Sequence, residues 1–145
     1  MSPTACEPAL PEAAWVAALA GLPKMGPVRL HALLETWEPA VAWERVRSGG
    51  LHRFAEVAVR CRGLGEDLDR AWSRAARTTD VDALWRRHAE EGVEVLVPGH
   101  PHWPVALLDD PEPPRVLFVR GAPSALSGPA VAVVGTRGCT PTGRA

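Results

Sequence analysis

The segment that decides the fold reads AVAVVGTRGCTP and spans residues 130–141. Its first five residues are apolar on both faces, which is typical of a strand buried between the layers of a parallel sheet. Gly135 ends this run and begins a glycine-rich loop. Thr140 and Pro141 then suit the N-cap and the first position of a helix. The order of strand, loop and helix predicts the start of a Rossmann-like α/β sheet.

The loop after this strand is a candidate phosphate site. Free backbone N–H groups and the dipole of the following helix favour an anion at such a place. The guanidinium of Arg137 adds a planar, bidentate donor. We therefore take Arg137, Gly135, Thr136 and Thr140 as candidate phosphate-binding residues. The alternative is a plain strand-to-helix turn whose glycines serve only geometry. The dinucleotide fingerprint and the P-loop pattern both lack required residues here, so nucleotide hydrolysis by a P-loop mechanism is not expected.

Two further strands are predicted before this loop, over residues 93–97 and 115–120. The Pro-rich passage between them, residues 98–114, has room for one short helix at 105–108. A parallel sheet needs crossover helices and more strands than these. We therefore interpret residues 92–145 as the incomplete first part of a Rossmann-like domain, and the chain as the front of a longer protein.

Residues 11–91 are predicted to form a small helical domain, and residues 1–10 a disordered tail. Apolar residues recur at helical spacing, as at Leu30, Leu33 and Trp37. This pattern predicts helices over residues 13–20, 27–37, 39–47, 52–61, 66–77 and from 79 or 80 to 92. Because the tryptophans follow the same spacing, we expect core residues rather than a stacking platform for bases. The fold class is therefore α + α/β.

The turn between the first two predicted helices reads Leu-Pro-Lys-Met-Gly-Pro and spans residues 22–27. A short loop that ends in Gly-Pro before an amphipathic helix is similar to a helix-hairpin-helix motif. In that motif, backbone amides at the second helix contact a DNA phosphate, and Lys24 and Gly26 are the candidate contacts here. The first hairpin glycine of the motif is missing, so a structural αα-hairpin is the favoured interpretation.

Composition limits the class of protein. The 145 residues are 46% hydrophobic and 23% charged, with a net charge of −1, which is typical of a globular chain. We predict no membrane span and no secretory signal. Three cysteines without a C-x-x-C pair fit a reduced cytoplasm. Fifteen of the sixteen basic residues are arginine, which is typical of a GC-rich coding sequence and is not by itself a nucleic-acid signal.

The charge is unevenly distributed along the chain. Residues 113–145 contain four arginines and no acid. An acid-free stretch of this length is a candidate anion-binding surface. The alternative is that these arginines lie on an ordinary solvated face.

Metal and catalytic chemistry find little support in the residue spacing. His100 and His102 flank Pro101, and a His-x-His pair can begin a metal site. No cysteine or third histidine is nearby in sequence, and Asp109 and Asp110 are taken as the only local acids. We therefore predict no metal site, no cofactor and no catalytic residues.

The motifs from residue 93 onward resemble one family closely. They are His102-Trp103-Pro104-x-x-Leu107-Leu108, Pro113-Pro114-x-x-Leu117-Phe118-x-x-Gly121 and Val134-Gly135-Thr136-Arg137. Their order and spacing resemble the N-terminal part of the DNA-processing protein A family (DprA, also called Smf). The resemblance spans about residues 10–145 and is specific from Val93 onward.

This resemblance implies a sterile-alpha-motif-like or hairpin helical domain followed by an extended Rossmann fold. It also implies a cytoplasmic mediator of natural transformation that binds single-stranded DNA and loads the recombinase RecA without catalysis. The arginine of the family's G-x-R loop lies in a DNA-binding pocket, and that role carries over to Arg137. Thr140 stands where the family usually has Ser or Thr. The full-length form is expected to be a homodimer, but most of the pocket, the dimer surface and the RecA contact would lie beyond Ala145.

Two alternatives come from other classes of protein. The first is a Rossmann-type enzyme that binds and cleaves nucleoside phosphates, although residues 113–145 offer no catalytic acid. The second is a duplex-DNA-binding helix-hairpin-helix module centred on Lys24 and Gly26.

Overall fold

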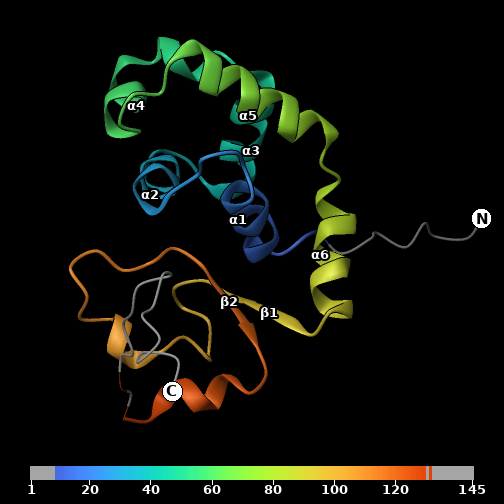
Figure 1. Ribbon diagram of the computed structural model, residues 1–145, viewed down its shortest axis with the longest axis vertical. Helices are drawn as coiled ribbons and strands as arrows, with labels where there is room; N and C mark the ends of the chain where they lie inside the picture. Colours follow the sequence, from blue (N-terminus) through green and yellow to red (C-terminus); the bar gives the residue numbers. More distant parts are fainter. Residues whose placement is uncertain (1–8, 130, 132–145) are drawn as a thin grey trace, which may run out of the picture.

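The computed structural model describes residues 9–129 and Val131 (Figure 1). The candidate phosphate loop with Gly135, Thr136, Arg137 and Thr140 lies outside the described residues. So does the predicted strand over 130–134, apart from Val131. No helix in the described part of the chain is both long and apolar enough to cross a membrane.

The described chain is mixed α and β, with six α-helices followed by a small sheet. The helices are α1 (Glu12–Ala20), α2 (Pro27–Thr36), α3 (Pro39–Ser48), α4 (Ala55–Arg60), α5 (Glu66–Thr78) and α6 (Val81–Glu90). The strands are β1 (Val93–Leu96) and β2 (Leu117–Arg120), and 3₁₀ turns occur at η1 (Leu51–Arg53), η2 (Val105–Leu107) and η3 (Pro123–Ser127). The predicted helices are confirmed to within a few residues at each end, with one exception: the segment 52–61 divides into η1 and α4.

Local chemistry explains several of the helix ends. Proline stands at the first position of α2 and of α3, where its missing N–H costs no helical hydrogen bond. The Asp80 side chain accepts a hydrogen bond from the Ala83 amide at 3.0 Å, which caps the N-terminus of α6. Gly49 and Gly50 end α3 at φ values of +78° and +89°, a region that favours glycine. The break at Phe54, between η1 and α4, is extended at φ −85° and ψ 96°.

The core of the helical part lies between α1, α3 and α5. Trp72 of α5 is completely buried, and Trp43 of α3 is 3% exposed. The Trp72 indole N–H donates to the Pro23 carbonyl oxygen at 2.8 Å, so its one polar group is satisfied inside the core. The prediction that the tryptophans of the helical domain serve the core is confirmed for these two residues.

The two strands pair antiparallel, with Val93 opposite Arg120 and Leu96 opposite Leu117. A parallel pair needs a long crossover, usually through a helix. Residues 97–116 supply only a Pro-rich loop with the short turn η2, so the chain reverses direction and β2 returns beside β1. The parallel part of the predicted sheet depends on residues 130–134 and stays a prediction.

The sheet packs against the helical part through β1. Figure 1 shows α1–α5 grouped above the strands, with α6 leading from one to the other. Val95 of β1 forms a small buried cluster with Ala13 and Ala17 of α1. A second link is polar, because Arg115 donates from Nε to His31 Nδ1 on α2 at 2.9 Å.

We expect Trp72→Ala to destabilise the fold by about 3–5 kcal/mol, because it leaves a large cavity and an unpaired Pro23 carbonyl. Trp72→Phe should cost less, since it retains most of the apolar contact. Urea unfolding followed by circular dichroism measures both changes. Trp85→Phe is the matched control because Trp85 is only partly buried. Equal effects of Trp72→Phe and Trp85→Phe would contradict the assigned role of the indole hydrogen bond.

Candidate nucleic-acid interface

A basic groove runs along α5 beside the turn that follows α3. It has a volume of about 460 Å³. Its lining residues are Ser48, Gly49, Gly50, His52, Arg53, Glu66, Asp69, Arg70, Ser73, Arg74 and Arg77. Four of these residues are arginines, and all four are exposed. Two are acids, so the groove carries an excess of positive charge.

The two acids of the groove are already paired. Asp69 is 2% exposed and accepts a hydrogen bond from the Gly50 amide at 2.9 Å. The same carboxylate oxygen contacts His52 Nδ1. Glu66 forms an ion pair with Arg70, one turn further along α5. Among the described residues, Arg53 and Arg74 take part in no ion pair. Their charge is therefore available to an external anion.

The same contacts hold the groove in shape. Ser73 donates from its hydroxyl to the Arg47 carbonyl at 2.9 Å, and Arg77 Nε donates to that same oxygen at 3.1 Å. A Cβ added at Gly49 would lie 3.4 Å from the Ser73 hydroxyl, so the turn passes close to α5. The turn after α3 and helix α5 together line the groove. Guanidinium groups in such a groove suit phosphate oxygens without any reading of sequence.

The sequence analysis did not identify this groove. Its signal was the spacing of Arg70, Arg74 and Arg77, which places three arginines on one face of a helix. The arginine excess was attributed to coding composition, and that argument does not distinguish scattered arginines from aligned ones. The spacing of residues could not have predicted that Arg53 lies beside these three arginines, because η1 and α5 are separate in sequence and meet only in the folded chain.

The turn between α1 and α2 is a hairpin whose carbonyl oxygens are bound inside the protein. Lys24 has a φ of +55°, and its carbonyl accepts from Arg29 Nη1 at 2.8 Å. Arg29 also donates to the carbonyls of Cys61 and Arg62, at 3.0 and 3.3 Å, which ties this turn to the end of α4. These contacts favour the structural αα-hairpin, and they do not confirm the helix-hairpin-helix interpretation.

Gly26 is not required by the fold. Its φ is −109°, and a Cβ built there meets nothing within 4 Å. The fold therefore accepts a side chain at this position. A role for Gly26 and the exposed Lys24 in contacting phosphate stays a prediction.

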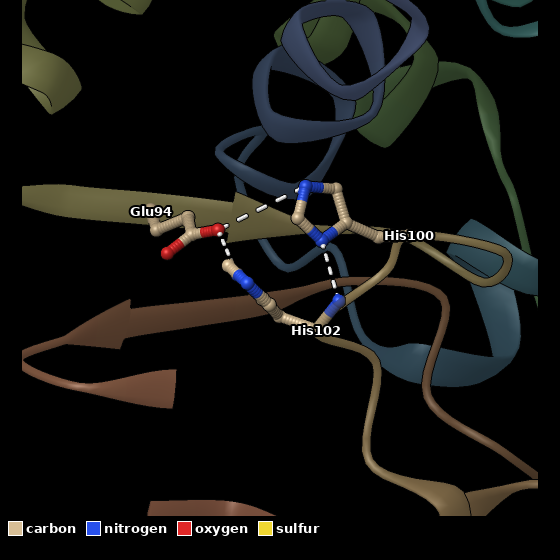
Figure 2. A group of neighbouring side chains, drawn as sticks. All are labelled: Glu94, His100 and His102. Atoms are coloured by element: carbon tan, nitrogen blue, oxygen red, sulfur yellow. Dashed lines mark hydrogen bonds and ion pairs between the residues drawn. The ribbon is translucent and has the colours of Figure 1, made fainter. Parts of the chain in front are cut away.

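The prediction that Asp109 and Asp110 are the only acids near His100 and His102 was wrong. The acid that lies beside His100 and His102 is Glu94, on β1, and the aspartates at 109 and 110 are not part of this group (Figure 2). Glu94 Oε1 lies 2.8 Å from His102 Nδ1 and 3.8 Å from His100 Nε2. The feature of the sequence that could have predicted this contact is the Pro98-Gly99 turn, because it folds the following loop back towards β1.

Comparison with known proteins adds one result. Residues 94–145 match the family model of DNA recombination-mediator protein A. The match starts on β1 and covers just over a third of the chain, including every motif on which the DprA resemblance is most specific. It confirms that resemblance over these residues and indicates a role in DNA recombination. No curated protein and no solved structure matched the chain.

Cys61 allows a test of the packing around the Arg29 contacts. Burial raises the pKa of the Cys61 thiol, and the nearby guanidinium groups of Arg29 and Arg60 lower it by a smaller amount. The thiol should therefore stay protonated near neutral pH and react slowly with iodoacetamide. Mass spectrometry of the Cys61 peptide over a pH series measures this reaction. Labelling should be fast in urea, and equally fast labelling of the folded chain would contradict the burial.

Proposed function

We propose that this protein binds single-stranded DNA and loads the recombinase RecA onto it, as a mediator of natural transformation. The observation that carries the proposal is the match of residues 94–145 to the family of DNA recombination mediators. The protein acts by binding and not by catalysis, in the cytoplasm, and works as a homodimer. DNA and RecA are its partners, and no cofactor takes part.

The arginine groove on α5 supports a nucleic-acid partner independently of the family match. A phosphate backbone is recognised mainly by charge, and arginine provides a planar fork that fits two phosphate oxygens. Arg53 and Arg74 are exposed, and both line the groove. We propose that the groove binds the phosphate backbone of DNA on the helical part.

The loop around Arg137 is the other proposed contact. Gly135 and Thr136 would present backbone N–H groups to a phosphate, Thr140 would begin the following helix, and Arg137 would add charge. This assignment follows from the resemblance and from the acid-free sequence around it.

We expect the triple variant Arg70→Gln, Arg74→Gln, Arg77→Gln to weaken binding to a single-stranded oligonucleotide. Each lost phosphate contact should reduce the salt slope of log K by about 0.7. Fluorescence anisotropy at several salt concentrations measures both quantities, with circular dichroism to verify folding. The matched control is Arg45→Gln, Arg86→Gln, Arg87→Gln, which removes the same charge from exposed positions on α3 and α6.

A loss confined to the groove variant supports DNA binding in the groove. Equal losses in both variants would mean that only net charge matters, and no loss in either would remove the groove from the DNA-binding surface. A preference for duplex over single strands would instead favour the hairpin module centred on Lys24.

We expect Arg137→Ala to weaken binding about equally for all DNA sequences, because a phosphate contact carries no sequence information. Arg137→Lys should recover only part of the affinity, since a lysine lacks the bidentate geometry. Anisotropy measures the affinities, and assembly of RecA on DNA coated with single-strand-binding protein measures loading. Unchanged affinity and salt slope in Arg137→Ala would refute the site.

A further inference from the structure

The strongest unassigned group of side chains is Glu94, His100 and His102. The three side chains converge from β1 and from the loop that follows it (Figure 2). One potential ligand atom from each residue lies within 4.8 Å of the others. All three are partly open to solvent, with side-chain exposures of 36%, 31% and 56% in that order. An ion could therefore enter without any rearrangement of the core.

The loop that carries the two histidines is held in place by its backbone. The His100 amide donates to the Val97 carbonyl at 3.0 Å, and the Trp103 amide donates to the His100 carbonyl at 2.8 Å. Gly99 adopts a φ of +92°, which a residue with a Cβ rarely does. Trp103 is buried directly after His102 and anchors the end of the loop. The ligand atoms are thus positioned before any ion binds, which lowers the entropy cost of binding.

The donor set selects the class of ion. Two imidazoles and one carboxylate are typical of Zn²⁺ and of neighbouring transition metals, whereas Mg²⁺ and Ca²⁺ prefer oxygen ligands. Ligands at zinc distances of about 2.0–2.1 Å in a tetrahedral site lie about 3.3 Å apart. The two separations from Glu94 Oε1, 2.8 and 3.8 Å, lie on either side of that value. Movements of about half an ångström would bring these two separations to that value, and the two imidazole nitrogens lie within 4.8 Å of each other.

We propose that Glu94, His100 and His102 form a three-ligand site for Zn²⁺ or a similar transition-metal ion. The carboxylate oxygen of Glu94, Nε2 of His100 and Nδ1 of His102 are the ligands. Three protein ligands leave the fourth position of a tetrahedral ion open to water or to an anionic group. The proposal does not depend on DNA binding by this chain.

Nδ1 of His102 contacts the Glu94 carboxylate as an N–H donor, so an ion at this nitrogen displaces its proton and the ring then carries its proton on Nε2. Binding also requires a proton to move on His100. Its Nδ1 now accepts a hydrogen bond from the His102 amide at 3.1 Å, so a neutral ring carries its proton on Nε2. An ion at Nε2 displaces that proton, and the ring then carries its proton on Nδ1. The His102 amide is in an exposed position and takes water as its new acceptor. The exchange costs two exposed hydrogen bonds, which is small beside the metal–ligand bonds that form.

Isothermal titration calorimetry of the whole chain with ZnCl₂ tests the site. We expect one Zn²⁺ per chain, and a rise in the unfolding temperature with Zn²⁺ that MgCl₂ does not produce. Glu94→Gln and His102→Ala should each weaken Zn²⁺ binding by about tenfold or more, since each removes a ligand. Co²⁺ should give the visible absorption of a four-coordinate ion in the parent chain and lose it in both variants.

His31→Gln is the matched control. His31 lies on α2 in contact with Glu35 and Arg115, and a glutamine amide can keep both partners. This variant should bind Zn²⁺ as the parent does. Absence of Zn²⁺ binding by the folded parent chain would overturn the proposal. Binding that is equally strong in the Glu94→Gln and His102→Ala variants would overturn it too, because the ion would then lie elsewhere.

Discussion

The indole hydrogen bond of Trp72 to the Pro23 carbonyl is the contact on which the rest of the helical part depends. It joins α5 to the turn between α1 and α2 across 49 positions of the sequence. A buried indole N–H without an acceptor is costly, so the ring enters the core only where this carbonyl is available. Once Trp72 is seated, α5 has a fixed rotation about its axis. Ser73 and Asp69 then face the end of α3, and they fix the Gly49-Gly50 turn there.

The rotation of α5 about its axis also determines which way its arginine side chains face. The helix buries Trp72 and Ala76 on one side, so Arg70, Arg74 and Arg77 lie along the exposed side, next to η1. The groove is therefore a consequence of core packing. Its acids are used to hold the turn and to pair with Arg70, which leaves the remaining guanidinium groups to face outward. The same packing that stabilises the domain thus places these guanidinium groups along one exposed groove.

The sheet is attached to the helical part by one apolar and one polar contact. Val95 packs on Ala13 and Ala17, whose small side chains let β1 approach α1 closely. Arg115 reaches the His31 ring and lies 3.8 Å from Glu35, so the chain before β2 is tied to α2. With β1 fixed on one face, the alternation of a strand turns Glu94 to the other, where the returning loop brings the two histidines. The proposed metal site follows from that alternation.

The sequence alone determined the helices (apart from the division of residues 52–61), the two described strands and the family to which residues 94–145 are similar. These features depend on local periodicity, on proline and glycine chemistry and on short motifs, all of which act between near neighbours. Three features were decided by the tertiary structure alone. They are the antiparallel pairing of β1 with β2, the position of Arg53 beside the arginines of α5, and the position of Glu94 beside His100 and His102. Each of these features brings together segments that are apart in the sequence, and no periodic pattern in the sequence predicts that they will be in contact. Their contacts are set by how the core packs and where the loops return.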